Sequence, residues 1–293
     1  MKSLTKYLNE KLVIFPSQVD EKSNIFPSQV DEKLVIFPSQ VDEKSSIFPS
    51  QVDEKLVINK DYKSPYTCAP ASWLELRKII NDRYDKLGPG TKNNPIDFND
   101  IDVSNMDSFR DNRSYHGIFE NTKFEYIDVS YWNVSKVKDM SYMFYDCEQL
   151  KSVGDLSKWD ISKVEDMFHM FYECEQLKSV GDLSKWDVSK VDTMSSMFHN
   201  CCNLKSVGDL SDWDVSKVDT MNSMFRRCEQ LTSVGNLTHW DVSKVEDISH
   251  MFCGCKHLKS VGDLSNWDVA RVRFMNNTFK ESGITNIPDW YRG

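Results

Sequence analysis

Apolar residues return along most of this chain at one fixed spacing. Tryptophans occupy positions 132, 159, 186, 213, 240 and 267, so that one unit is 27 residues long. Within the unit that begins at Trp159, an apolar residue follows at about every third position, and each has an equivalent one unit later. Because a single unit cannot bury such a row against itself, the period predicts a solenoid or a similar array of stacked units.

Two local patterns predict the elements of one unit. A helical face is indicated by apolar residues at i, i+3, i+4 and i+7, namely Met167, Met170, Phe171 and Cys174. Residues 159–162 alternate apolar and polar, as a short strand does. Gly181 marks a turn before the next alternating stretch. We therefore expect one coil per unit, with a short helix, a bend and a short parallel strand.

The unit also carries a specific motif. It contains F-x-x-C-x-x-L-x-x-V, followed by L-S-x-W-D-V-S-x-V-x-x-M. In this form it resembles the BspA-like leucine-rich repeat, and more narrowly the W-D-V-S-x-V subtype of mycoplasma lipoprotein-type repeats, which is also found in many bacterial and phage proteins. The resemblance extends from about Asp97 to the C-terminus. It implies an α/β repeat fold, a right-handed leucine-rich-repeat-like solenoid, and a binding rather than a catalytic role; some members are surface adhesins.

A second, unrelated repeat precedes the coils. The sequence F-P-S-Q-V-D-E-K occurs four times within residues 15–58, at a period of 11 residues. A proline in every copy opposes a coiled coil, because proline removes a helix hydrogen bond. We therefore expect extended or disordered chain in this array, which reads as an insertion. Residues 1–14 fit a short amphipathic helix.

A helix with clear end signals is expected just before the first coil. Ser72 suits the N-cap, Glu75 completes a capping box, and Gly88 ends the helix. Its predicted apolar face consists of Trp73, Leu76, Ile79, Ile80, Tyr84 and Leu87. A terminal coil needs a cap, and this helix is the candidate. The expected organisation is an N-terminal segment at 1–14, the tandem array at 15–58, a linker and capping helix at 59–96, and the solenoid at 97–293.

Composition narrows the possible partners and compartment. The formal net charge of −9 argues against a general nucleic-acid binder. No stretch approaches the about 18 apolar residues of a membrane span. The eight cysteines fit a reducing compartment better than a disulfide framework. Because the first residues contain no hydrophobic run of signal-peptide length, we expect a cytoplasmic protein. A location at the cell surface or on a virion is the alternative.

Metal sites are considered in two places. His250, Cys253, Cys255 and His257 form an H-x2-C-x-C-x-H pattern with zinc-type ligands. We favour a structural role instead, because Cys255 belongs to a cysteine column that recurs on the inward face of the coils. Calcium is the second possibility, at two aspartate columns: 155, 182, 209 and 263, and 160, 187, 214, 241 and 268. Here we favour side chains that bond backbone amides at bends, so no cofactor is expected.

Binding remains as the leading function. The chain contains no nucleophile elbow, P-loop or dinucleotide fingerprint, and we therefore predict no enzyme. A partner should contact outward positions that vary between coils, and aromatic residues and arginine are typical anchors. One column lies just before the tryptophan: Tyr131, Lys158, Lys185, Asp212 and His239. The other flanks the expected helix: Tyr142, His169 and His250, with Tyr145, Tyr172, His199 and Arg226. We predict a protein–protein interaction scaffold; the alternatives are an exported bacterial surface adhesin and a metal-stabilised structural protein.

Overall fold

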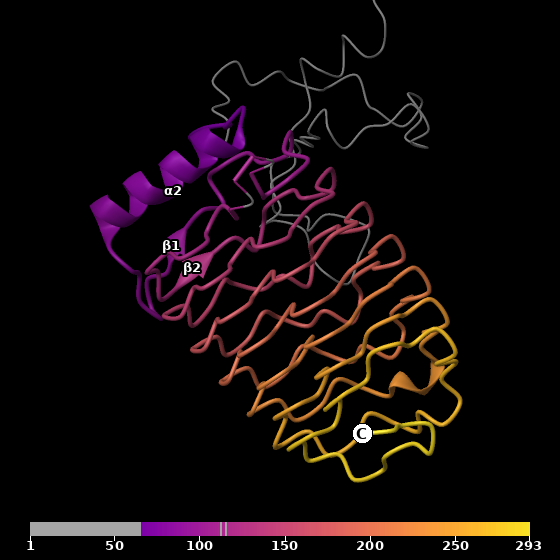
Figure 1. Cartoon of the computed structure of the whole chain (residues 1–293). Helices are drawn as coiled ribbons and strands as arrows, with labels where there is room; N and C mark the ends of the chain where they lie inside the picture. The colour runs from indigo at the N-terminus through magenta and orange to yellow at the C-terminus, as the bar shows by residue number, and fades with distance from the viewer. Residues whose placement is uncertain (1–65, 112, 115) are drawn as a thin grey trace, which may run out of the picture. The chain divides into compact units, whose positions relative to one another are not determined.

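The computed structural model describes residues 66–111, 113–114 and 116–293. The predicted helix at 1–14 and the tandem array at 15–58 lie outside the described residues. The named elements are helix α2 (Trp73–Leu87), strands β1 (Ile96–Asp97) and β2 (Ile127–Asp128), and the 3-10 helix η4 (Leu237–His239). All other described residues form turns, isolated bridges and irregular chain, which Figure 1 shows as coils stacked one after another. No helix in the described part of the chain is long and apolar enough to cross a membrane.

Successive coils are joined by backbone hydrogen bonds. A row of parallel bridges connects equivalent residues, in the order Ser108, Asp139, Asp166, Thr193, Thr220, Asp247 and Phe274. Beside this row, the N–H groups of His169, Phe171 and Glu173 donate to carbonyl groups of the following coil over 3.1, 2.8 and 2.9 Å. The same pattern repeats in the other coils. The 27-residue sequence period is therefore the period of a hydrogen-bonded stack.

The prediction of one helix and one strand per coil is wrong. The apolar residues at 167–174 are buried as expected, but they lie on two tight turns, in which Met170 and Cys174 bond the carbonyl group three residues back. His169 and Glu173 have φ of 56° and 58°, which an α-helix does not tolerate. Their N–H groups bond the next coil instead of the residue four positions back. Residues 159–161 form irregular chain rather than a strand, and a turn begins at Ser162.

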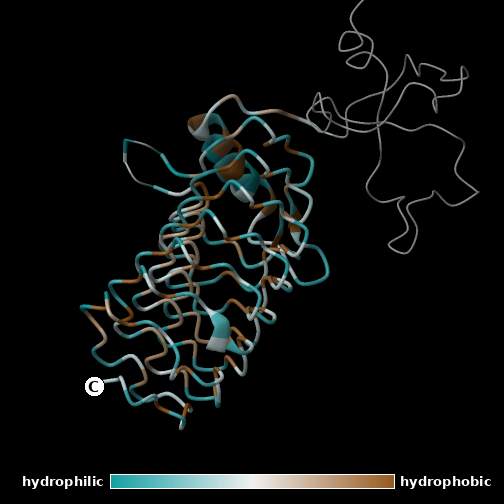
Figure 2. Ribbon diagram, turned by 90° about the vertical axis from the view of Figure 1, so that its right-hand side faces the viewer, coloured by the Kyte–Doolittle hydropathy of each residue, from teal (hydrophilic) through white to brown (hydrophobic). Residues whose placement is uncertain are grey.

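The interior consists of columns of equivalent side chains. Phenylalanine rings stack from coil to coil, as in Phe144–Phe171, whose ring centroids are 5.0 Å apart at 8°. Each tryptophan of the coils donates its indole N–H to a carbonyl group of the preceding coil, as Trp213 does to Leu183 over 3.0 Å. Each cysteine of the buried column donates similarly, as Cys201 does to Phe171 over 3.1 Å. Hydrophobic and hydrophilic residues alternate along every coil in Figure 2, so each coil contributes to the core and to the surface.

The bends between coils use aspartate and glycine as expected from the sequence. In both aspartate columns a carboxylate oxygen accepts the N–H two residues later, as Asp155 does from Ser157 over 3.0 Å and Asp160 from Ser162 over 3.1 Å. This confirms that the aspartates bond backbone amides. Gly181 follows at φ 88°, and a Cβ there would overlap Oδ1 of Asp155 in the preceding coil. Only glycine satisfies both the dihedral angle and the close approach.

Helix α2 covers the first coil. Ser72 Oγ accepts the N–H of Glu75 at 3.3 Å, and the Gly88 N–H donates to Tyr84 over 2.7 Å, which confirms both predicted ends. Leu76 and Ile80 are fully buried in the core that the coils share. Arg77 donates from its guanidinium to the carbonyl groups of Ile118 and Glu120, over 2.8 and 2.9 Å. Leu87 does not belong to the apolar face, since it is 56% exposed.

Candidate binding surface

The outward positions of the stack differ between coils, and two of their columns were singled out in the sequence. The column before the tryptophan consists of Tyr131, Lys158, Lys185, Asp212 and His239, and all five side chains are exposed. Their charges are mixed. This column is therefore a solvated edge of mixed charge.

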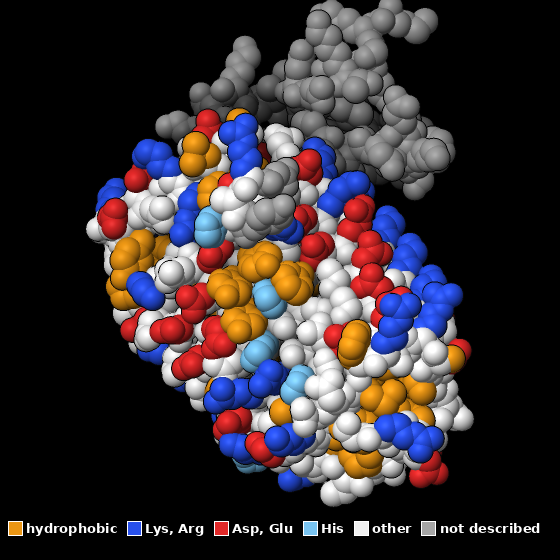
Figure 3. Space-filling view, in the orientation of Figure 1, with side chains coloured by type: hydrophobic (Ala, Val, Ile, Leu, Met, Phe, Trp, Pro, Cys, Tyr) orange, Lys and Arg blue, Asp and Glu red, His pale blue; other side chains and the backbone are white. Residues whose placement is uncertain are grey.

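The second column is different, because its aromatic residues are in contact. Six half-buried rings form one cluster, which we name the aromatic patch: Tyr142, Tyr145, Phe168, His169, Tyr172 and His199. Tyr145 and Tyr172 stack with ring centroids 4.9 Å apart at 8°. His169 lies 5.3 Å from Tyr142 and 4.6 Å from Tyr172, and Tyr172 lies 4.7 Å from His199. Figure 3 shows hydrophobic side chains in contact with histidines near the centre of one face.

The backbone of the coil presents these rings to the surface. Tyr142 and His169 both have positive φ, of 57° and 56°, and both donate their N–H to the next coil. The residues between the rings point inward, as buried Met143 and Met170 show. The stack thus places equivalent side chains above one another, and aromatic residues at the same position of two coils come into contact, either stacked as Tyr145–Tyr172 or edge to face as Tyr142–His169.

Phe168 was missed by the sequence prediction, which named His169 and His199 but not this residue. Phe168 occupies a position that is Ser141 and Ser195 in the adjacent coils. Its ring lies 3.8 Å from that of His169 and 5.4 Å from that of Tyr142. An aromatic residue at a column that is otherwise polar was the available signal.

The aromatic patch is uncharged at neutral pH. Burial lowers the pKa of His169 to about 4, and burial together with the nearby Arg226 lowers that of His199 to about 4. Burial also raises the pKa of the three tyrosines above the usual value. Within the described residues, Nδ1 of His169 is buried without a hydrogen-bond partner. The aromatic patch therefore presents neutral, largely apolar ring faces.

Charged residues border the aromatic patch at one end. The guanidinium of Arg110 lies 5.6 Å from the ring centroid of Tyr142, a cation–π contact. It also lies 3.7 Å from Asp139 and 3.8 Å from Asp166. Burial raises the pKa of Asp166, and Asp139 adds to the rise. An aromatic surface with a polar rim is the composition typical of protein interfaces.

Arg226 continues the second column beyond the aromatic patch, close enough to His199 to help lower its pKa. It follows Tyr145, Tyr172 and His199 in register, one coil further on. There it lines a separate cavity together with Arg227, His250 and Lys280.

The residues considered as metal ligands have other partners. Cys255 is buried and donates to the carbonyl group of Phe225 over 2.9 Å. His257 Nδ1 lies 2.7 Å from the carbonyl oxygen of Glu229, and His250 Nε2 lies 3.2 Å from Asn276. Across the part of the chain that the structure describes, no group of three or more His, Cys, Asp or Glu side chains is arranged to hold a metal ion.

Comparison with known proteins gives a family but no function. A family model described as "Mycoplasma protein of unknown function, DUF285" matches residues 91–203 and again residues 175–290. No curated protein matches the chain. Among solved structures, one match is a leucine rich cell surface protein from Faecalibacterium prausnitzii A2-165, with 14% identity and a TM-score of 0.12, over 58% of this chain and 81% of that chain. A TM-score at this level does not relate the two folds.

Proposed function

The chain belongs to the family described as Mycoplasma protein of unknown function, DUF285, and from that starting point we propose that it is a non-enzymatic protein–protein interaction scaffold. Its stack of coils is, in this proposal, a right-handed leucine-rich-repeat-like solenoid of the BspA-like kind. The bridges that join equivalent residues of successive coils support a repeat stack of this type. The aromatic patch is the surface that meets the partner.

One observation carries the proposal: the stack does not need the aromatic patch. Tyr142 and His169 belong to a column whose next two members are Ser196 and Ser223. These serines have nearly the same φ, 55° and 56°, and their N–H groups make the same bonds to the next coil. The coil therefore forms equally with serine at this position. Tyr142, Phe168 and His169 lie at positions where the fold accepts serine, and the other three rings lie in a column that also accepts arginine and lysine. The gathering of all six rings on one face therefore supports a role in recognition.

The chemistry of the aromatic patch suits a protein partner. Tyrosine contributes a large apolar area at a small cost in side-chain entropy, and interface anchors are enriched in Tyr, Trp and Arg. The low pKa values of His169 and His199 keep the rings neutral, so that burial under a partner carries no cost of removing a charge from water. Arg110 and its aspartates supply a polar rim at which hydrogen bonds fix orientation.

The test compares two variants that the chain itself suggests. Tyr142→Ser with His169→Ser removes two rings and inserts the residue that the same position carries elsewhere. The matched control, Lys158→Asn with Lys185→Asn, replaces two residues of the exposed column before the tryptophan. It inserts asparagine, which the same column carries at Asn266. Proteins captured from a lysate of the producing cell are identified by mass spectrometry, and the affinity of a purified partner is then measured by calorimetry. Circular dichroism verifies that both variants fold.

We expect the aromatic-patch variant to bind its partner at least about tenfold more weakly, because losing two anchors costs about 1–2 kcal/mol each. The control should bind as the wild-type protein does. Loss of binding in the control alone would move recognition to the other column. Equal capture by all three proteins, or no specific capture at all, would contradict the proposal.

We also propose that the protein works in a reducing compartment, the cytoplasm. All eight cysteines are free thiols, and five of them are buried in one column. A membrane-impermeant maleimide tests this, because the half-buried Cys68 and Cys202 are available to it. Labelling only after cell lysis would agree with the proposal. Labelling of intact cells would instead place the protein at the surface and support the adhesin alternative.

A further inference from the structure

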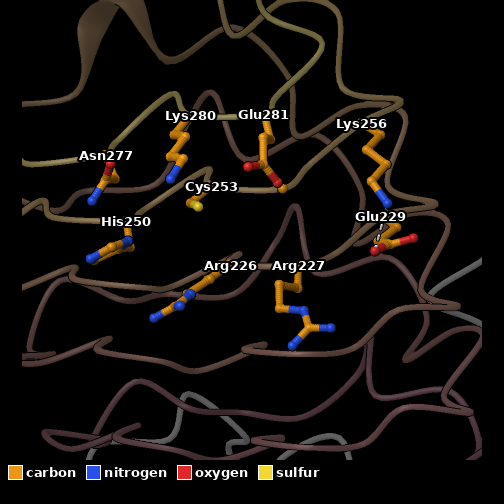
Figure 4. A pocket seen from close by; sticks show the side chains of 10 residues that line it. Arg226, Arg227, Glu229, His250, Cys253, Lys256, Asn277, Lys280 and Glu281 are labelled. Carbon is orange, nitrogen blue, oxygen red and sulfur yellow. Dashed lines mark hydrogen bonds and ion pairs between the residues drawn. The ribbon is translucent and has the colours of Figure 1, made fainter. Parts of the chain in front are cut away.

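A cavity of about 390 Å³ opens between the last coils. Arg226, Arg227, His250 and Lys280 line it, together with the pair Lys256–Glu229, and Figure 4 shows their side chains. The lining carries four basic side chains and two carboxylates, on a chain whose formal net charge is −9. The volume lies in the range of cavities that hold small molecules, about 300–1,000 Å³.

Three of the four cations in this cavity form no ion pair within the part of the chain that the structure describes. Lys256 lies 2.9 Å from Glu229 and forms an ion pair with it. Among the described residues, no carboxylate lies within 4.0 Å of Arg226, Arg227 or Lys280, although cations elsewhere on the stack are paired, as Arg273 is with Glu246 over 3.2 Å. Three unpaired cations around one hollow repel each other, and this cost is repaid when an anion binds.

Arg226 and Lys280 both lie close enough to the imidazole of His250 to affect its pKa. The pKa of His250 is lowered by burial first, and then by the positive charges of Arg226 and Lys280. Within the described part of the chain, Nε of Arg226 and Nδ1 of His250 are buried without a hydrogen-bond partner. In Figure 4 the side chains of Lys280, His250 and Asn277 gather at one side, the Lys256–Glu229 pair lies at the other, and Glu281 lies between them. The side opposite the ion pair therefore carries cations and an amide.

The charge of this cavity is local to these coils. The column of Arg227 carries Asp146 and Glu173 in the coils beside the aromatic patch, and Asn200 between them and Arg227. The column of Lys280 and Arg226 carries Tyr145 and Tyr172 in the same early coils. The repeat thus does not require a base at either position.

We propose that this cavity binds a tetrahedral oxyanion, the phosphate or sulfate group of a small molecule. Arginine presents a planar set of N–H donors that matches the oxygens of such a group, and lysine adds a mobile point charge. Asn277 supplies an uncharged amide on the same side. The volume exceeds that of the anion alone and leaves room for the molecule that carries it. This site is independent of the aromatic patch and of the proposed interaction function.

The test is calorimetric titration of the full chain with inorganic phosphate, sulfate and glucose 6-phosphate, with glucose as the uncharged control. The site variant is Arg226→Gln with Lys280→Gln. The matched control is Lys217→Gln with Lys244→Gln, two exposed lysines outside the cavity whose loss changes the net charge equally. Thermal unfolding establishes that each variant folds, and Arg227→Asn, which inserts the residue of Asn200, provides a third variant compatible with the positive φ of 59°.

We expect phosphate to bind the wild-type protein, with affinity at least about tenfold lower in both cavity variants and within about twofold in the control. Tighter binding of glucose 6-phosphate would identify a carried phosphate group, and equal binding would identify the free ion. A second readout is the NMR titration of His250, whose pKa should rise when a bound anion opposes Arg226 and Lys280. No binding of any oxyanion at millimolar concentration, or equal binding by site and control variants, would overturn the proposal.

Discussion

The cysteine column offers a sharp test of how the stack is held together. Cys201 is fully buried and its Sγ donates to the carbonyl oxygen of Phe171, one coil earlier, over 3.1 Å. Burial raises the pKa of this thiol well above its usual value, so the proton needed for the bond is retained. Cys202 follows directly, is half-buried, and contacts only Oδ1 of Asn200 at 3.2 Å through its side chain. The two neighbours differ in environment and not in chemistry.

The expected cost of Cys201→Ala follows from three contributions. The carbonyl oxygen of Phe171 keeps only the 3.3 Å bond from the N–H of Cys174, and the lost thiol bond is worth about 0.5–1 kcal/mol. Burial of the sulfur removes from water an apolar surface comparable to that of a methylene group, and this contributes about 0.8 kcal/mol to stability. The cavity it leaves adds about 0.5 kcal/mol. The free energy of unfolding should therefore fall by about 2 kcal/mol. Cys202→Ala should change it by less than about 0.5 kcal/mol, as surface substitutions do.

The measurement is urea unfolding followed by tryptophan fluorescence, for both alanine variants and for Cys201→Ser. Serine keeps a donor at the same place, so its cost should lie below that of alanine if the bond to Phe171 matters. Equal costs for Cys201→Ala and Cys202→Ala would refute the reasoning. A serine variant no better than alanine would show that the column stabilises the stack by packing alone.

Three further predictions concern the same coils. A thiol reagent should label three cysteines in the folded protein and all eight after unfolding, the accessible ones being Cys68, Cys202 and Cys253 by mass spectrometry. His169 and His199 have a pKa of about 4 in the folded protein and near 6.5 in the unfolded chain, so the unfolded state binds more protons between these pH values. The stability that the two neutral histidines contribute is therefore complete above pH 6.5 and is lost as the pH falls to 4. In urea unfolding, the variant His169→Ser with His199→Tyr should lose less free energy of unfolding over this range than the wild-type protein, by about 1 kcal/mol or more after a discount for partial exposure. Gly181→Ala should lower the free energy of unfolding by more than about 2 kcal/mol, because its Cβ would overlap Asp155. Gly88→Ala should cost only about 1 kcal/mol of backbone strain, because Gly88 has φ of 76° but its Cβ would meet no atom within 4 Å. Thermal unfolding of the two variants compares these costs.

The sequence was sufficient to predict what is buried. Residues such as Met167, Phe171 and Cys174 recur at one period, and burial follows directly from that recurrence. The aspartate bends and both ends of α2 were also predictable, because Asx turns and caps depend on residues two or three positions apart. Interactions of this range are contained in the local sequence.

Secondary structure within the coil was not predictable in the same way. The i, i+3, i+4 spacing of an apolar helix face also describes two tight turns, and only the partners of the N–H groups distinguish the two cases. Those partners lie in the next coil, 26 residues away for His169 and Ser195. Positive φ at Tyr142 or Glu173 has no residue signal of its own. The available signals were equivalent residues of other coils, Asn200 and Gly254 for Glu173 and Asn277 for Tyr142, because Asn and Gly adopt positive φ more readily than other residues.

The candidate sites follow the same division. Tyr145 and Tyr172 could be aligned from the sequence because they are equivalent positions of adjacent coils. Phe168 and His169 join them by lateral contacts between two different columns, and the distance between columns depends on the turn geometry. The cavity around Arg226 and Lys280 lies between coils and was invisible to any analysis of one unit.

The strictly neighbour-to-neighbour bonding has a consequence for how this molecule can change over generations. Trp213 bonds Leu183 and Cys201 bonds Phe171, and each such bond spans a single junction between coils. A gene duplication or deletion of 27 codons would therefore restore every junction that it cuts. Such an event between His199 and Arg226 would alter the separation of the aromatic patch from the oxyanion cavity by one coil, about 4.8 Å. Copy number would then act as a graduated adjustment of the spacing between two recognition sites, made without redesigning either.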